Sequence, residues 1–116
     1  MPSKAADDLH DALDLLDDTI ALVRKALNHN PSDSERRDLE QLLLRLKSER
    51  GVLQAEFDFV LDKDTEVQAP STTQVAAVAD LSNKVAQATQ QANLSSDAVA
   101  LAGKVFDLAT SIVTHV

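Results

Sequence analysis

The sequence predicts an all-α protein, an antiparallel up-down-up-down four-helix bundle built from two helical hairpins. Leu, Ala and Val dominate an apolar fraction of 44%, and Leu and Ala are strong helix formers. Only two Gly and three Pro occur in 116 residues, whereas an all-β fold needs more turn residues than that. Apolar residues also recur at alternating intervals of three and four, which is the spacing of helices that bury one face.

The first hairpin is predicted from a heptad stripe and a capping pattern. Apolar residues spaced 4, 3, 4, 3 and 4 apart predict a first helix over residues 5–28. Pro31 then breaks the helix. Ser32 and Glu35 have the spacing of a capping box, so a second helix is predicted over residues 34–63. The stripe of the first helix comprises Leu9, Leu13, Leu16, Ile20, Val23 and Leu27.

The second hairpin is predicted from a second capping pattern and a broad apolar face. Ser71 and Gln74 repeat the capping-box spacing at the start of a helix expected over residues 72–92. A fourth helix is expected over residues 96–115, and its apolar residues form two adjacent stripes. A face this wide predicts either a central helix covered by its own neighbours or a surface that binds a partner. The partner-binding candidates on its second stripe are Val99, Phe106 and Val113.

Arg50 interrupts the apolar stripe of the second predicted helix. In an antiparallel hairpin it faces the region of Leu16 and Asp17. One interpretation is a buried polar layer that fixes the register of the helices. The other is an arginine whose stem covers Leu16 while its charged end reaches solvent at the edge of the bundle. The sequence favours the second interpretation.

Charge divides the chain into two parts. Residues 1–69 contain nine Lys/Arg and sixteen Asp/Glu, whereas residues 70–116 contain two and three. We expect a single helical domain over residues 1–116, with an acidic hairpin over 1–66 and a low-charge, Ala- and Val-rich hairpin over 71–116. The second hairpin has about 47 residues, which is too few for an independent core. The net charge of −8 argues against nucleic-acid binding, which needs a basic surface.

Asp7, Asp11, Asp14 and Asp18 lie together on the side of the first predicted helix that faces away from its apolar stripe. Such a row of carboxylates is either a solvated face or a surface that docks a basic partner. His10 lies beside them, and imidazole with carboxylates is metal-ligand chemistry. Metal sites in helical bundles use Glu-x-x-His motifs that point inward from facing helices. No such motif occurs in the sequence, so no metal site is predicted.

No catalytic or cofactor-binding residues are predicted. The chain has no Cys, which excludes disulfides and thiolate chemistry. Two Gly are too few for a phosphate-binding loop, and neither a nucleophile elbow nor a dinucleotide fingerprint occurs. The sequence therefore predicts that the protein is not an enzyme.

The predicted function is a non-catalytic protein–protein interaction module. We expect a small cytosolic helical chaperone, immunity protein or adaptor that binds a protein partner, a second copy of itself, or both. A cytoplasmic location is expected because the N-terminus lacks a secretory signal and no apolar run approaches about 18 residues. The alternative is a protein that lies on a membrane or lipid surface through its low-charge C-terminal hairpin. Interfacial helices usually carry Lys or Arg on their polar face, so protein binding is favoured.

Overall fold

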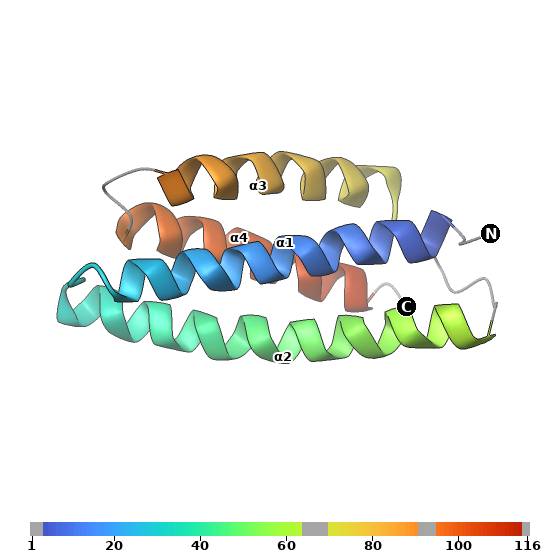
Figure 1. The fold of residues 1–116 in the computed structure, drawn as a ribbon, viewed down its shortest axis with the longest axis horizontal. Coiled ribbons are helices and arrows are strands. Elements are labelled where there is room, and N and C mark those ends of the chain that lie inside the picture. Colours follow the sequence, from blue (N-terminus) through green and yellow to red (C-terminus); the bar gives the residue numbers. More distant parts are fainter. Residues whose placement is uncertain (1–3, 64–69, 91–94, 115–116) are drawn as a thin grey trace.

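The computed structural model describes residues 4–63, 70–90 and 95–114, with side chains described over 7–58, 70–90 and 97–112. These residues form four helices and, within the described ranges, no strand. Successive helices run in opposite directions along one long axis (Figure 1). The predicted all-α four-helix bundle is therefore confirmed. The helices are α1 (Lys4–Leu27), α2 (Asp33–Lys63), α3 (Thr72–Gln90) and α4 (Ser95–Thr114).

The predicted helix ends agree closely with the observed ones. The expected ends at residues 92 and 115 lie outside the described residues, and the other six differ from the observed ends by at most one residue. Both capping boxes are present. The backbone N–H of Glu35 donates to Ser32 Oγ at 3.2 Å, and the N–H of Ser32 donates to Glu35 Oε1 at 3.3 Å. Ser71 and Gln74 make the same reciprocal pair at 3.1 and 2.9 Å, so each pattern satisfies two otherwise orphaned groups.

α1 and α4 form the centre of the bundle. Each contacts the other three helices, whereas α2 and α3 do not contact each other within the described residues. α2 and α3 therefore lie on opposite sides of the α1–α4 pair (Figure 1). The second helix of one hairpin and the first helix of the other are thus kept apart, although they are consecutive in the chain.

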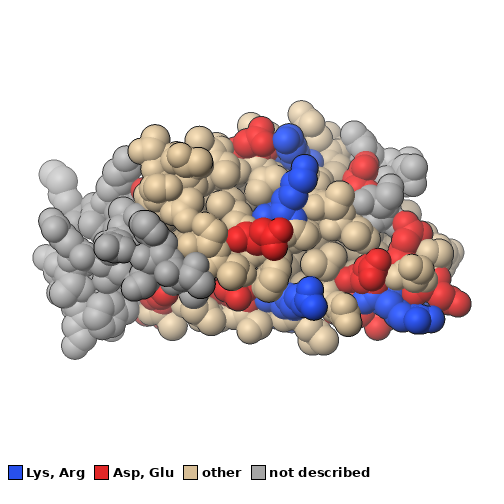
Figure 2. Space-filling model, turned by 180° about the vertical axis from the view of Figure 1, so that it is seen from behind, with Lys and Arg blue, Asp and Glu red and all other residues tan. Residues whose placement is uncertain are grey.

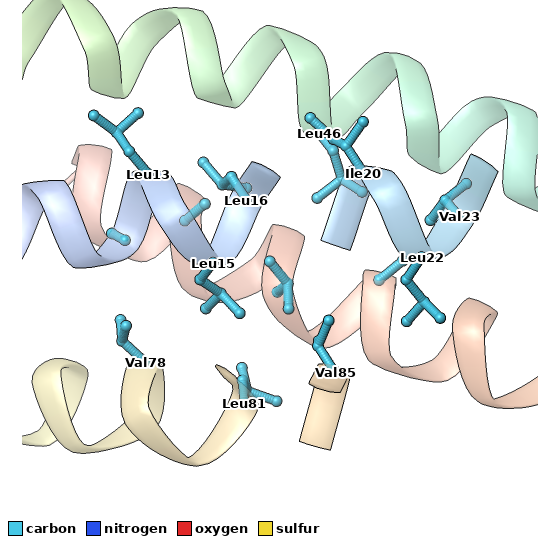
Figure 3. Packing of buried hydrophobic residues seen from close by; sticks show 14 of the residues in the cluster. Leu13, Leu15, Leu16, Ile20, Leu22, Val23, Leu46, Val78, Leu81 and Val85 are labelled. Atoms are coloured by element: carbon cyan, nitrogen blue, oxygen red, sulfur yellow. The ribbon is translucent and has the colours of Figure 1, made fainter. Parts of the chain in front are cut away.

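The core of α1 is wider than its predicted stripe. Leu9 to Val23 of that stripe are buried and Leu27 is half-buried, but six further residues on a neighbouring line of the helix are buried as well. Figure 3 shows the reason: Leu13 and Ile20 point toward α2, whereas Leu15 and Leu22 point toward α3 and α4. A central helix must bury about half of its circumference. The second stripe comprises Asp8, Ala12, Leu15, Thr19, Leu22 and Ala26.

α4 is also covered on a wide face. Its most buried residues fall between the two stripes expected from the sequence, at spacings of four and three. Val99 and Phe106 flank this line and are half-buried against the core. The side chain of Val113 lies outside the described residues. For the residues described, the breadth of the apolar face follows from the central position of α4. The buried line comprises Ala98, Ala102, Val105, Ala109 and Ile112.

Arg50 lies at the edge between α1 and α2. Its Nε donates to Asp17 Oδ1 at 2.5 Å and its Nη2 donates to Asp17 Oδ2 at 3.3 Å. The two side chains are 38% and 47% exposed. The hydrogen bond with Asp17, followed by the attraction of its charge, raises the pKa of Arg50 above its ordinary value. This geometry supports the interpretation in which Arg50 reaches solvent at the edge of the bundle. It gives no support to the interpretation of Arg50 as a buried polar layer.

Candidate functional site

The acidic face of α1 consists of Asp7, Asp11, Asp14 and Asp18. All four are exposed, on the side of α1 that faces away from the core. Among the described residues, their only ion pair joins Asp14 Oδ2 to His10 Nδ1 at 3.4 Å, and that histidine is charged only when it is protonated. Because the opposite half of α1 is buried, the four carboxylates stand on a fixed scaffold. The predicted row of negative charge therefore exists as a surface.

A cavity of about 240 Å³ opens beside this face, between α1 and α3. α1 and α3 run in the same direction (Figure 1), so the N-terminal parts of both helices lie side by side. Asp11 and Asp14 belong both to the acidic face and to the cavity wall. The cavity therefore continues the acidic face inward, toward the core. Its lining comprises Asp8, Asp11 and Asp14 from α1, with Pro70, Val75, Val78, Ala79 and Ser82.

Asp8 is the functional candidate that sequence reasoning missed. It is only 8% exposed, and its Oδ2 atom is buried without a hydrogen-bond partner among the described residues. Burial of an unpaired carboxylate is costly. The sequence carried a signal for it, because position 8 begins the second stripe of α1, at spacings of 4, 3, 4, 3 and 4. An aspartate placed on a core stripe is unusual enough to indicate a role other than packing.

His10, Asp11 and Asp14 also lie close to one another on the outer side of α1. Their ligand atoms are all within 4.8 Å, and all three residues are exposed. The His10 ring has a second neighbour in Phe57 of α2, with 5.9 Å between the ring centroids. One imidazole and two carboxylates suit a divalent cation, but exposed acidic groups often lie together without one. The expectation that the chain holds no metal stays a prediction.

The apolar candidates lie on a different part of the molecule. Val99 and Phe106 are half-buried against the core, and the Arg45 guanidinium lies 5.8 Å from the centroid of the Phe106 ring. Figure 2, which views the bundle from the side opposite to Figure 1, shows charged side chains of both signs among uncharged ones. Val113, the third apolar candidate, has its side chain outside the described residues. The structure therefore brings the acidic candidates together and separates them from the apolar ones.

Within the described residues, no helix is long and apolar enough to cross a membrane. Comparison of the chain with protein families, with curated proteins and with solved structures finds no significant match. The chemistry of the acidic face and of the cavity beside it is therefore the basis for assigning a function.

Proposed function

We propose that this protein is a non-catalytic protein–protein interaction module whose acidic face docks a basic surface of a protein partner. The observation that carries the proposal is the row of Asp7, Asp11, Asp14 and Asp18, four exposed carboxylates with one His10 contact between them. In biological terms this is a small cytoplasmic helical chaperone, immunity protein or adaptor. Complementary charge of this kind selects partners and speeds their encounter.

The shape of the acidic face favours binding over catalysis. Asp11 and Asp14 converge with His10, but the row as a whole extends from Asp7 to Asp18 along the exposed side of one helix, as a docking surface does and as the enclosed constellation of an active site does not. Catalysis also needs a nucleophile or a base with a shifted pKa in a cleft. On the acidic face, the groups with that chemistry are exposed carboxylates and one exposed imidazole. A rigid, charged surface is suited to recognition of a macromolecule.

A capture experiment with matched variants tests the proposal. The tagged full chain is used to recover partners from lysate of the source cells. In the test variant, Asp7, Asp11, Asp14 and Asp18 are each replaced by Asn. The control variant carries the same loss of four charges at exposed positions of α2, namely Asp33→Asn, Asp38→Asn, Glu40→Gln and Asp58→Asn.

The expected result is a basic protein recovered by the wild type and by the control, and lost with the acidic-face variant. Increasing salt should weaken the recovery, because exposed charges are screened. Equal recovery by both variants would contradict docking through the acidic face. Recovery of no protein by the wild type would contradict the interaction module itself, unless light scattering shows that the chain binds its own copy.

A second candidate is favoured by the surface of the C-terminal hairpin, which carries two Lys and three Asp over residues 70–116. That surface fits a protein that lies on a lipid surface through its C-terminal hairpin. The hairpin has only two Lys and no Arg to attract anionic lipids, so this candidate ranks second. Flotation with anionic liposomes distinguishes the two: the interaction module stays at the bottom of the gradient, whereas a lipid-bound protein rises.

A further inference from the structure

We propose that the cavity between α1 and α3 receives a lysine or arginine side chain of the protein partner. This inference rests on the proposed function and names the chemistry of the contact. Three features of the cavity carry it: a row of carboxylates, one buried carboxylate oxygen that has no hydrogen-bond partner among the described residues, and an apolar wall.

The carboxylates supply the charge. Asp8, Asp11 and Asp14 are spaced three residues apart, so they follow one another along the cavity from turn to turn of α1. Asp11 and Asp14 are exposed, whereas Asp8 is 8% exposed. The acidic groups therefore lead from the surface to the buried end of the cavity. A cation that enters meets negative charge along the whole path.

Asp8 supplies the specific contact. Its Oδ2 atom is buried and lacks a hydrogen-bond partner among the described residues. A buried carboxylate is stabilised most effectively by a charged donor such as ammonium or guanidinium. Within the described residues, Lys84 of α3 does not line this cavity and pairs with Asp80 at 3.0 Å. A cation from another molecule would complete this site.

The apolar wall selects a long aliphatic cation. Val75, Val78 and Ala79 of α3 face the carboxylates, together with Pro70. Lysine and arginine cover apolar surface with their methylene stems while their charged ends reach polar groups. The cavity volume of about 240 Å³ is below the roughly 300–1,000 Å³ of sites for drug-sized ligands. A single side chain fits this size better than a cofactor.

A divalent cation fits the cavity less well. Calcium and magnesium need about six oxygen ligands or more, and much of this wall is hydrocarbon. The group with converging ligand atoms consists of His10, Asp11 and Asp14, and it does not include Asp8. The buried carboxylate is thus separate from the residues that a metal would use.

Titration by NMR tests the inference on the full chain labelled with nitrogen-15. The probes are acetyl-Gly-Lys-Gly-amide, the corresponding arginine peptide, and a norleucine peptide that keeps the aliphatic stem without the charge. The lysine or arginine peptide should cause saturable shifts at the amides of Asp8, Val78 and Ser82, and the norleucine peptide should not. Equal shifts with norleucine would overturn the inference, as would unsaturable shifts spread over every acidic residue.

Matched variants separate the cavity from general electrostatics. Asp8→Asn should lower the affinity for the lysine or arginine peptide by about tenfold or more, because one charged contact is lost. Asp38→Asn removes the same charge at an exposed position of α2, outside both the cavity and the acidic face, and should leave the affinity within about twofold. Ala79→Leu keeps every carboxylate and fills the cavity, so it should also abolish binding, even if Asp8→Asn impairs folding. Equal effects of Asp8→Asn and Asp38→Asn would overturn the inference.

Titration with competing cations tests the remaining alternatives for the occupant of the cavity. Magnesium or zinc should shift only the amide signals of His10, Asp11 and Asp14. If the peptides still bind at Asp8 in the presence of the metal, the inference is supported. Either metal bound at Asp8 more tightly than the peptides would make the cavity a metal site and overturn it. If spermidine binds at the cavity at lower concentration than either peptide, the cavity is assigned to free polyamines. That result would overturn the proposal that it receives a side chain of a protein partner.

The two proposals fail independently. A partner captured equally well by wild type and by Asp8→Asn, with no peptide shifts at the cavity, would reject the cavity contact alone. Peptide binding at Asp8 without any recovered partner or self-association would reject the interaction module and leave the cation site standing.

Discussion

α1 and α2 belong to the same acidic hairpin and both carry apolar residues at heptad spacing, yet they bury different fractions of their surface. α1 buries two stripes, because it contacts three other helices, whereas α2 lies on the outside of the bundle and contacts two. The fully buried leucines of α2 recur only at heptad intervals, as Leu39, Leu46 and Leu53, while Leu44 is 69% exposed. Place in the bundle, more than heptad pattern, therefore decides how much of a helix is buried.

The difference has a functional side. The central helix is held by the core over half of its circumference, and its remaining half carries the acidic face. α2 has more exposed surface but a mixed population of charges, with Arg36 and Arg37 beside Asp33 and Asp38. Arg24 and Lys25 of α1 lie in its last turn, beyond the four aspartates, so the acidic face itself carries charges of one sign on a packed scaffold, which suits recognition.

The largest expected effect comes from one substitution placed on each helix. Leu22→Ala in α1 removes a side chain that is fully buried, and such changes cost about 2–5 kcal/mol of unfolding free energy. Leu44→Ala in α2 removes the same atoms from an exposed site and should change the free energy by less than about 0.5 kcal/mol. Urea denaturation of both variants checks this. Similar losses from the two would remove the distinction between central and outer helix.

The next effect concerns the buried carboxylate. Asp8→Ala should stabilise the isolated protein relative to Asp11→Ala by about 1 kcal/mol, because it removes a buried acceptor that has no partner among the described residues. Both changes give the same gain in helix propensity, so their difference isolates burial. Thermal melts of the two variants measure it. A lower stability for Asp8→Ala than for Asp11→Ala would show that the Asp8 carboxylate stabilises the free protein.

A smaller effect is expected at the edge between α1 and α2. Arg50→Leu removes a half-exposed ion pair with Asp17, and such pairs contribute about 0–1 kcal/mol. The melting temperature should stay the same or rise slightly, with unchanged oligomeric state by size-exclusion chromatography with light scattering. A changed oligomeric state would indicate that Arg50 specifies register after all.

The smallest effect is a pH dependence on α2. Burial raises the pKa of Glu56 above its ordinary value of 4.5, so the folded protein binds the proton more tightly than the unfolded chain. The contribution of Glu56 to the free energy of unfolding is therefore highest below pH 4.5, and it falls as the pH rises through the raised pKa. Glu56→Gln should flatten this part of the stability profile and raise stability at neutral pH by no more than about 0.5 kcal/mol. An unchanged profile, measured by urea denaturation across pH, would contradict the shift.

Local signals in the sequence predicted much of this fold. The Ser32–Glu35 and Ser71–Gln74 patterns gave helix starts within one residue, because a capping box is a contact between neighbours in the chain. The exposure of Asp7, Asp11, Asp14 and Asp18 followed from helix geometry alone.

The tertiary arrangement was less predictable. The second stripe of α1 has heptad spacing, but Asp8 and Thr19 interrupt its apolar residues, so the apolar pattern alone does not predict its burial. Thr19 tolerates burial because its hydroxyl donates to the Leu15 carbonyl at 2.7 Å. Asp8 is buried beside α3, whose residues line the same cavity. The cavity joins residues of α1 and α3 that are more than fifty positions apart. Only the packing of α3 against α1 creates that site.

The central claim is that the protein binds its partner through the outer half of α1. The most direct test is to measure the affinity of the purified partner for the wild type and for the variants. Isothermal titration calorimetry at low and at physiological salt should show binding at least about tenfold weaker for the Asp7/Asp11/Asp14/Asp18→Asn variant, a loss of roughly 1.4 kcal/mol. The α2 control with the same loss of charge should bind like the wild type, and salt should weaken both equally. Equal affinities for the acidic-face variant and the wild type would contradict the role assigned to the acidic face.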